Sequence, residues 1–200
     1  MRKITVVLTL GVVMTLLSTV AQAGFVNPGE NPGAMPFTCE FPDNQNQHDW
    51  EFDYDISVPT LIMDEIISFV DTDYVLISGE TDEDPIFTVV KTIQNTSGIN
   101  WTSYILSLAG GTGATFVNGS ASAGGNKLQT VNYLHDAAIE FSGANPVADG
   151  EFLTLSFNIN VPTEGLFNFT LTQEPVPEPA TIGLLSLGSL VLFRRRQAKS

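Results

Sequence analysis

Residues 151–172 read EFLTLSFNINVPTEGLFNFTLT, and this stretch decides the fold class. Apolar residues occupy every second position from Leu153 to Val161, and Thr, Ser or Asn fills the positions between them. A second alternating run follows, with Phe167, Phe169 and Leu171 on one side. Alternation with a period of two is typical of strands that bury one face. The PTEG between the runs predicts a turn, so the two runs are predicted to form a hairpin.

The same pattern extends toward the N-terminus. In WEFDYDISV at 50–58, apolar residues alternate with acidic residues and one serine. The apolar spacing at 61–70 allows either a short helix or a strand. About seven to nine short strands predict an all-β fold, an antiparallel β-sandwich with Ig-like or jelly-roll-like topology, and an open barrel is a rival. The further predicted strands are 73–78, 85–93, 100–108, 114–117 and 127–134.

The charge distribution is strongly asymmetric. The chain has 22 acidic and 8 basic residues, which gives a formal net charge of −14. All the acidic residues lie within 24–179, where Lys91 and Lys127 are the only basic residues. Such a negative field repels nucleic acid and anionic lipid. We therefore exclude both as partners of the body of the protein.

The N-terminus has the three parts of a secretory signal. Arg2 and Lys3 give a positive start, an uncharged apolar stretch follows, and Ala21 and Ala23 place small residues where a signal peptidase requires them. We therefore predict a signal peptide over 1–23, removed after Ala23. A transmembrane anchor is the alternative, because the apolar stretch is close to the minimum length that spans a bilayer.

The C-terminus ends on an apolar stretch followed by basic residues. As a helix, residues 180–193 would be shorter than the hydrocarbon core of a bilayer, which is about 30 Å thick. The basic residues after them would hold that end in the cytoplasm. This arrangement predicts transient membrane contact through the C-terminal segment. A permanent single-span anchor is the alternative.

The order of these parts resembles the PEP-CTERM sorting signal of Gram-negative bacteria. Pro177, Glu178 and Pro179 match the Pro-Glu-Pro motif, and the apolar stretch follows. The arginines that complete the signal are Arg194, Arg195 and Arg196. The resemblance implies cleavage by an exosortase, a membrane cysteine transpeptidase-like enzyme. It also implies a bacterium that makes exopolysaccharide and delivery to the cell surface or matrix. We expect the two prolines to keep the scissile region extended, unfolded and accessible.

A shorter stretch also resembles PEP-CTERM cargo proteins. NTSGINWTSY at 95–104 is similar to an Asn-Thr-Ser/Thr-Gly…Trp-Thr-aromatic segment of such proteins. The resemblance implies an adjoining pair of strands and no chemistry. We expect Trp101 to be a core or sheet-face aromatic, and a sugar-stacking platform is the alternative.

The chain therefore divides into four predicted parts. They are a signal peptide at 1–23, a Pro/Gly/Asn-rich arm at 24–48, a β-sandwich domain at 49–174 and the sorting signal at 175–200. Signal peptidase and exosortase are the partners expected during export.

Groups that could support catalysis are scarce. The chain has two histidines, His48 and His135, and we place His48 in or beside the arm. The stretch SASAG at 120–124 lacks the first glycine of the G-x-S-x-G nucleophile elbow, so a pair of Ser122 with His135 has little support. We predict no catalytic residues and no enzymatic activity.

Calcium is the one metal worth considering. One cysteine, Cys39, and two histidines are too few for a structural zinc site. Asp82, Glu83 and Asp84 lie together in a predicted turn and offer the hard oxygen ligands that calcium takes, although they follow no loop consensus. No other cofactor is predicted. Cys39 is expected to be buried or free, and an intermolecular disulfide is the alternative.

Three classes of function stay open. The leading class is an exported surface or extracellular-matrix protein associated with exopolysaccharide, with a non-enzymatic structural or adhesive role. The second is a carbohydrate-binding module in which aromatics such as Trp50, Tyr54 or Trp101 stack on sugars, although Trp50 and Tyr54 fall on the apolar side of their strand. The third is a secreted hydrolase.

Overall fold

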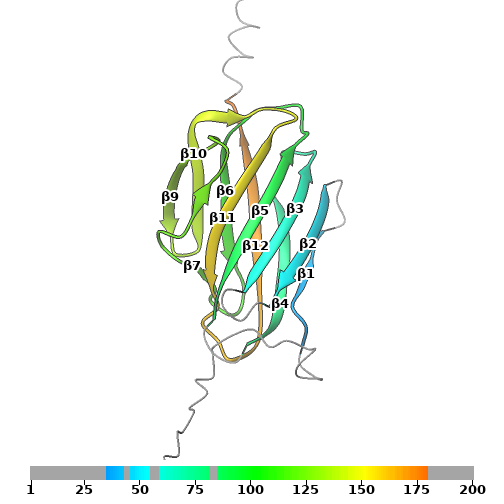
Figure 1. The fold of residues 1–200 in the computed structure, drawn as a ribbon, viewed down its shortest axis with the longest axis vertical. Coiled ribbons are helices and arrows are strands. Elements are labelled where there is room, and N and C mark those ends of the chain that lie inside the picture. Colours follow the sequence, from blue (N-terminus) through cyan, green and yellow to red (C-terminus); the bar gives the residue numbers. More distant parts are fainter. Residues whose placement is uncertain (1–34, 43–45, 55–58, 82–84, 180–200) are drawn as a thin grey trace, which may run out of the picture.

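A computed structural model describes residues 35–42, 46–54, 59–81 and 85–179 (Figure 1). The predicted signal peptide, with Ala21 and Ala23, lies outside the described residues. The apolar stretch of the predicted sorting signal, with Arg194, Arg195 and Arg196, also lies outside them.

The described residues form two sheets of six strands that pack face to face. We call them sheet A and sheet B. Sheet A has the order β1 (Thr38–Glu40), β4 (Asp73–Thr81), β12 (Gly165–Pro177), β6 (Trp101–Ala109), β10 (Ala138–Val147) and β9 (Thr130–His135). Sheet B has the order β2 (Gln47–Asp53), β3 (Thr60–Ile67), β5 (Ile86–Asn95), β11 (Phe152–Asn160) and β7 (Thr115–Phe116), and β8 (Ser122–Ala123) also pairs with β11. In Figure 1, sheet B is the layer nearer the viewer.

The core lies between the sheets and follows from the alternation in the sequence. The apolar residues of β11 and β12 that the period of two places on one side are all buried, as are the corresponding residues of β5. Polar residues between them face outward because successive side chains of a strand point to opposite faces. The predicted all-β sandwich is therefore confirmed. It is mostly antiparallel, with β3 and β5 as a parallel pair.

The predicted hairpin at 151–172 is wrong. β11 belongs to sheet B, where it pairs with β5, β7 and β8, whereas β12 belongs to sheet A and pairs with β4 and β6. The turn at 162–165 therefore connects the two layers of the sandwich. The alternating pattern fixes which face of each strand is apolar, and the two apolar faces here meet across the core rather than side by side in one sheet.

Other elements refine the predicted boundaries. The ambiguous stretch at 61–70 forms β3, a strand. β1 of sheet A and the start of β2 of sheet B lie in the range that we assigned to an arm, so both sheets begin before residue 49. At the other end, β12 extends past residue 174 to Pro177.

β10 was not predicted as a strand. Its sequence, AIEFSGANPV, contains glycine, asparagine and proline, which are typical of loops. Ile139 and Phe141 are nevertheless fully buried and hold the first half in the sheet. Gly143 has a φ of +151°, and a Cβ atom there would lie 3.2 Å from the backbone nitrogen of Gln129. The glycine therefore permits a close approach of two backbone segments, and the pairing of β10 with β6 is irregular there.

Candidate functional site

The end of β12 carries the predicted sorting motif. Pro177 is the last residue of β12 and pairs with Trp101 of β6. The backbone N–H of Glu178 donates to the carbonyl oxygen of Asn100 at 3.0 Å, and Nδ2 of Asn100 donates to Oε1 of Glu178 at 3.4 Å. Pro179 is exposed. The motif is thus extended, as the prolines require, but Pro177 and Glu178 are bound to the sandwich. We expected the scissile region near the motif to be unfolded, but Pro177 and Glu178 are folded against the sandwich.

The segment that holds the motif is the connection between β5 and β6. Nδ2 of Asn95 donates to the carbonyl oxygens of Ile99 and Val147 at 2.8 and 3.0 Å, and its Oδ1 accepts from the hydroxyl of Ser97 at 2.7 Å. That hydroxyl in turn accepts from Nε1 of Trp101 at 3.2 Å. These bonds organise the stretch at 95–104. The side chains of Asn95, Ser97 and Trp101 thereby fix the connection to which the sorting motif binds.

The second notable feature is a chain of buried polar groups that crosses the sandwich. His48 of β2, Glu65 of β3 and Lys91 of β5 come from sheet B, and Asp73 of β4 comes from sheet A. We call these four residues the buried charge cluster. Nδ1 of His48 lies 3.5 Å from Oε1 of Glu65, and Nε2 of His48 lies 3.3 Å from Oδ2 of Asp73. Nζ of Lys91 contacts Oε1 of Glu65.

The cluster continues into sheet A through neutral groups. Asp73 accepts hydrogen bonds from Asn46 at 2.9 Å and from Nε2 of Gln173 at 3.5 Å. Oε1 of Gln173 accepts from the hydroxyl of Tyr104 at 2.7 Å. The ring of His48 stacks on Phe41, with ring centroids 4.3 Å apart. Every charged side chain of the cluster is at most 5% exposed.

The pKa values of the cluster follow from these contacts. Burial opposes the charge on His48, but its hydrogen bonds with Asp73 and Glu65 outweigh burial and raise its pKa to about 9. Burial likewise opposes the charge on Asp73, but hydrogen bonds from His48 and Asn46 lower its pKa to about 2. Burial opposes the charge on Glu65 as well, but the charge of Lys91 and the contacts with His48 and Lys91 together outweigh burial and lower its pKa. At neutral pH His48 is therefore positively charged, and Asp73 and Glu65 are negatively charged.

The buried charge cluster was not predicted from the sequence, although the sequence contains a signal for it. Lys91 alternates with the buried Phe87, Val89 and Ile93, and Glu65 alternates with buried apolar residues of β3. The period of two therefore places both side chains in the core. His48 belongs to β2 rather than to an arm.

Other predicted site residues are distributed as follows. Trp101 is fully buried, as expected of a core aromatic, and Trp50 and Tyr54 pack against the core. Trp101 therefore has no exposed ring face on which a sugar could stack, and Trp50 and Tyr54 are partly buried. Nδ1 of His135 accepts from the backbone N–H of Ala137 at 3.2 Å, and no hydrogen bond joins it to Ser122, although the structure describes both residues.

The predicted calcium ligands Asp82, Glu83 and Asp84 lie outside the described residues. Within the part that the structure describes, no group of three or more His, Cys, Asp or Glu side chains could hold a metal ion. Cys39 is buried in β1, and burial raises its pKa to about 12.

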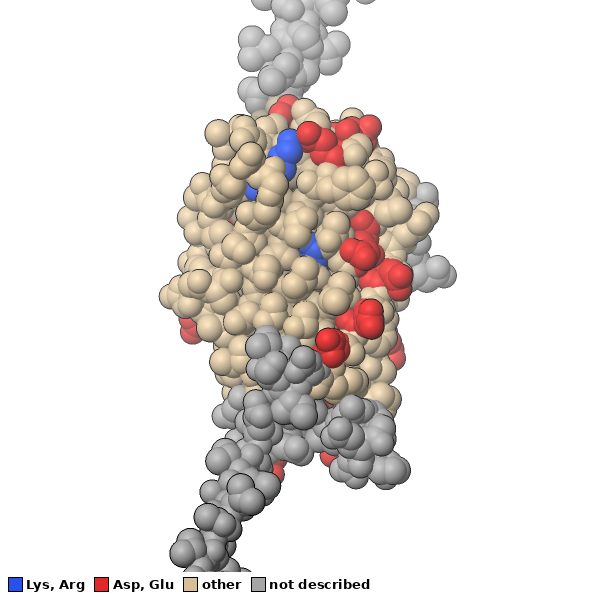
Figure 2. Space-filling model, viewed as in Figure 1, with Lys and Arg blue, Asp and Glu red and all other residues tan. Residues whose placement is uncertain are grey.

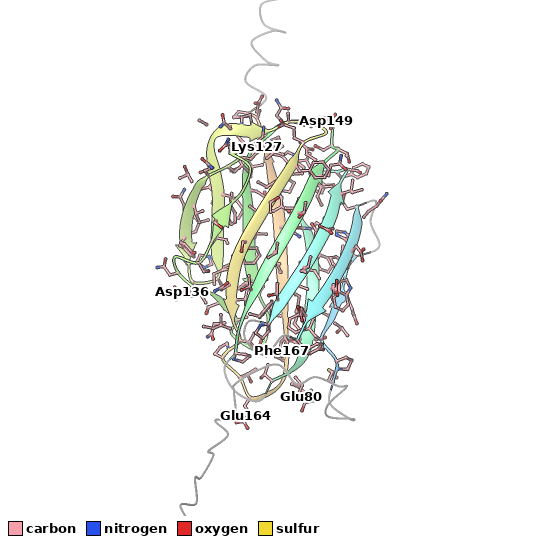
Figure 3. The ribbon with its side chains drawn as sticks, viewed as in Figure 1. Glu80, Lys127, Asp136, Asp149, Glu164 and Phe167 are labelled. Carbon is pink, nitrogen blue, oxygen red and sulfur yellow. The ribbon has the colours of Figure 1, made fainter. Side chains whose placement is uncertain are left out.

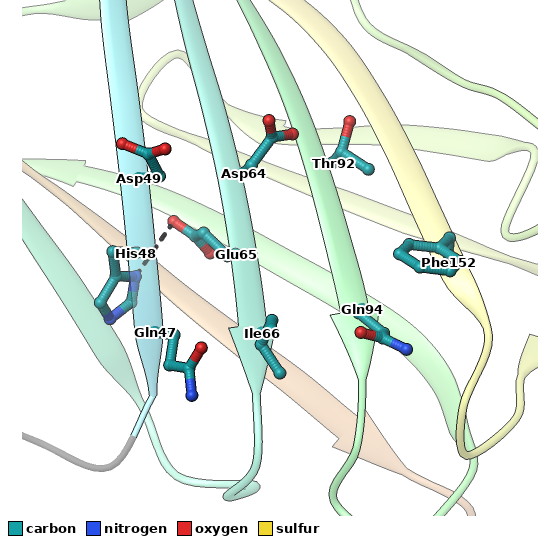
Figure 4. Close-up of a pocket in the computed structure, with 9 residues that line it drawn as sticks. All are labelled: Gln47, His48, Asp49, Asp64, Glu65, Ile66, Thr92, Gln94 and Phe152. Atoms are coloured by element: carbon teal, nitrogen blue, oxygen red, sulfur yellow. Dashed lines mark ion pairs between the residues drawn. The ribbon is translucent and has the colours of Figure 1, made fainter.

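A hollow of about 340 Å³ lies on the outer face of sheet B (Figure 4). Two cross-strand rows of side chains line it, which we call the outer rows. The first row is Asp49, Asp64 and Thr92, and the second is Gln47, Ile66, Gln94 and Phe152. His48 and Glu65 also border the hollow. Figure 2 shows acidic residues gathered over the β2 and β3 side of the same face. Among them, the exposed residues are Asp49, Glu51, Asp53 and Asp64.

The fold and the C-terminal motif together define a class of protein, a β-sandwich domain whose last strand leads into a sorting signal for export. Residues 175–197 match the family model of the PEP-CTERM protein-sorting motif. The chain therefore carries a PEP-CTERM sorting motif after its β-sandwich domain, and the motif implies exosortase processing, export and sorting to the cell surface. Neither the curated proteins nor the solved structures contain a match to it. In the described residues, no helix has the length and apolar character needed to cross a membrane.

Proposed function

We propose that this protein is a non-enzymatic surface or extracellular-matrix protein that associates with exopolysaccharide after an exosortase has processed it. The observation that carries the proposal is the sorting motif at 175–197, joined directly to a folded sandwich. Two further observations support a role without catalysis. His48 is held in the buried charge cluster, and His135 is bonded to its own turn.

The test is the location of the protein in its native host. We expect the processed chain in the extracellular matrix fraction together with the exopolysaccharide. In a strain unable to synthesise the polysaccharide, the processed chain should move to the culture medium, because the matrix that retains it is missing. Equal retention in both strains would contradict the association with exopolysaccharide.

A carbohydrate-binding module is a second candidate, and the hollow on sheet B favours it. Gln47, Gln94 and Thr92 offer amide and hydroxyl groups for hydrogen bonds to sugar hydroxyls. Phe152 is 57% exposed at the edge of the hollow and could stack on a sugar ring. Its ring is more exposed than those of Trp50, Tyr54 and Trp101, so Phe152 is the better candidate platform.

A matched pair of variants separates the two candidates. If the hollow binds sugar, Phe152→Ser should weaken retention of the mature chain on the purified exopolysaccharide about tenfold, or by about 1.4 kcal/mol. Leu166→Ser is the control, because Leu166 is 63% exposed and belongs to β12 of the other sheet. Figure 3 shows its neighbour Phe167 toward the end of the sandwich opposite Lys127 and Asp149. Equal retention of both variants would exclude the hollow as the binding site.

A further inference from the structure

We propose that Lys91 and Glu65 condense into an intramolecular isopeptide bond, which covalently joins β5 to β3 in the core. The inference concerns a covalent modification of the sandwich and does not depend on the function proposed above. It rests on the placement of the two side chains, on the polar groups that they leave without partners, and on the acid–base groups beside them.

The two reacting groups are already in contact. Glu65 and Lys91 lie on adjacent parallel strands, and the register pairs Met63 with Lys91 and Glu65 with Ile93. Glu65 and Lys91 are therefore diagonal neighbours on the same inward face. Nζ of Lys91 contacts Oε1 of Glu65, and both side chains are 0% exposed. No rearrangement of the sheet is required to bring the amine nitrogen to the carboxyl carbon.

The ionic form of this pair is costly. A lysine ammonium has three donors, and a carboxylate has two acceptor oxygens. Apart from the ion contacts within the cluster, Nζ of Lys91 and both Glu65 oxygens have no hydrogen-bond partner in the described part of the chain. Burying charged groups with so few partners carries a large desolvation penalty. An amide carries no charge and needs only one donor and one acceptor satisfied, so condensation relieves most of this penalty.

The reaction balances without any other reagent. A proton passes from the Lys91 ammonium to the Glu65 carboxyl group and settles on Oε2, which leaves a neutral amine beside a neutral acid whose carbonyl oxygen is Oε1. The amine nitrogen attacks Cδ of Glu65, so that a C–N bond forms and a tetrahedral intermediate results. The bond from Cδ to Oε2 then breaks, and Oε2 leaves as water with the proton that the nitrogen releases. One ammonium and one carboxylate become one amide and one water.

His48 is placed to assist this step. Its Nδ1 lies 3.5 Å from Oε1 of Glu65, the oxygen that becomes negative in the tetrahedral intermediate. Asp73 lies 3.3 Å from the other ring nitrogen and stabilises the imidazolium. A positioned donor that meets a developing oxyanion in a water-excluded site is an effective catalytic group. The sandwich therefore contains a nucleophile, an electrophile and an oxyanion donor in one buried cluster.

A covalent link of this kind would suit an exported chain with a single cysteine. Cys39 has no second cysteine in the sequence with which to form an intramolecular disulfide. An amide between Glu65 and Lys91 would join β5 to β3, the strand that pairs with the edge strand β2. Unlike a disulfide, this amide would be resistant to reduction.

The test is the intact mass of the denatured full chain, purified in folded form, with its termini mapped. We expect the wild type to be lighter than its sequence mass by one water. Proteolysis should then yield a branched peptide that contains both Glu65 and Lys91. Lys91→Met should have its full sequence mass. Lys91→Arg should also have its full mass. Because arginine keeps the positive charge, this variant provides the test if Lys91→Met fails to fold.

Lys127 provides the matched control. Its Nζ lies 2.5 Å from Oε2 of Glu151, but this pair is solvent-accessible, with side chains 22% and 43% exposed. Lys127→Met should therefore keep the mass deficit. A wild-type chain that folds and retains its full sequence mass would overturn the proposal. A deficit that persists in Lys91→Arg would also overturn it, because the water would then have been lost elsewhere.

The contribution of His48 is measured from the time course of water loss after refolding. In His48→Gln we expect the bond to form roughly 10²-fold more slowly, because the donor to the oxyanion is neutral. An unchanged rate in this variant would show that His48 does not assist bond formation. Whether the bond forms at all is decided by the mass measurement.

Discussion

Replacing Pro177, Glu178 and Pro179 together by alanine is expected to leave almost all of the protein unprocessed at the membrane. The three residues are the Pro-Glu-Pro part of the sorting motif that matches at 175–197. Without them the exosortase has no recognition element, while the predicted signal peptide and the apolar tail are unchanged. Fractionation of the host and the intact mass of the protein in each fraction give the readout. Normal release of this variant would contradict the sorting role of the motif.

The control for this variant is Asn100→Ala. Nδ2 of Asn100 donates to Oε1 of Glu178 at 3.4 Å, so the substitution removes one of the side-chain contacts that bind the motif to the sandwich. The motif itself remains intact, and the bond from the backbone N–H of Glu178 to the carbonyl oxygen of Asn100 can still form. We expect Asn100→Ala to be processed as completely as the wild type. The comparison separates loss of the recognition element from a disturbance at the end of β12.

The period of two predicted which side of each strand is buried, but it could not predict which strands pair. β11 and β12 illustrate this, because both have the expected buried face and yet belong to different sheets. Pairing depends on which edges are already occupied, and β11 has its edges filled by β5, β7 and β8. The parallel pairing of β3 with β5 was equally invisible, since it depends on the path of the chain between them.

The two candidate sites differ in the same way. The sorting motif is a linear signal, so Pro177 and Glu178 could be identified from the sequence. Their binding to Asn100 and Trp101 could not, because it depends on the register of β12 with β6. The buried charge cluster needs residues from four strands. The alternation could have marked its charged residues as inward-facing one strand at a time, but only the packing of sheet A on sheet B brings Asp73 to His48.

Removing the carboxylate of Asp73 is expected to produce a large loss of stability. Asp73 is 2% exposed and faces the imidazolium of His48, which is also buried. Breaking a buried ion pair on one side costs about 3–5 kcal/mol, because the remaining charge loses its partner. We therefore expect Asp73→Ala to lower the free energy of unfolding by that amount in urea denaturation. Asp71→Ala is the control, since Asp71 is exposed and the substitution should change stability by less than about 0.5 kcal/mol.

The dependence of stability on pH tests the same pair without removing any contact atom. The folded pKa of His48 is about 9, above the ordinary value of 6.5, so its contribution is complete below pH 6.5 and is lost as the pH rises through 9. The folded pKa of Asp73 is about 2, below the ordinary value of 3.8, so its contribution is complete above pH 3.8 and is lost as the pH falls through 2. Asp73→Asn keeps the size of the side chain but removes the charge. In that variant the alkaline loss should shrink, because the imidazolium of His48 is then less favoured in the folded state. An alkaline loss equal to that of the wild type would show that Asp73 does not stabilise the charge on His48.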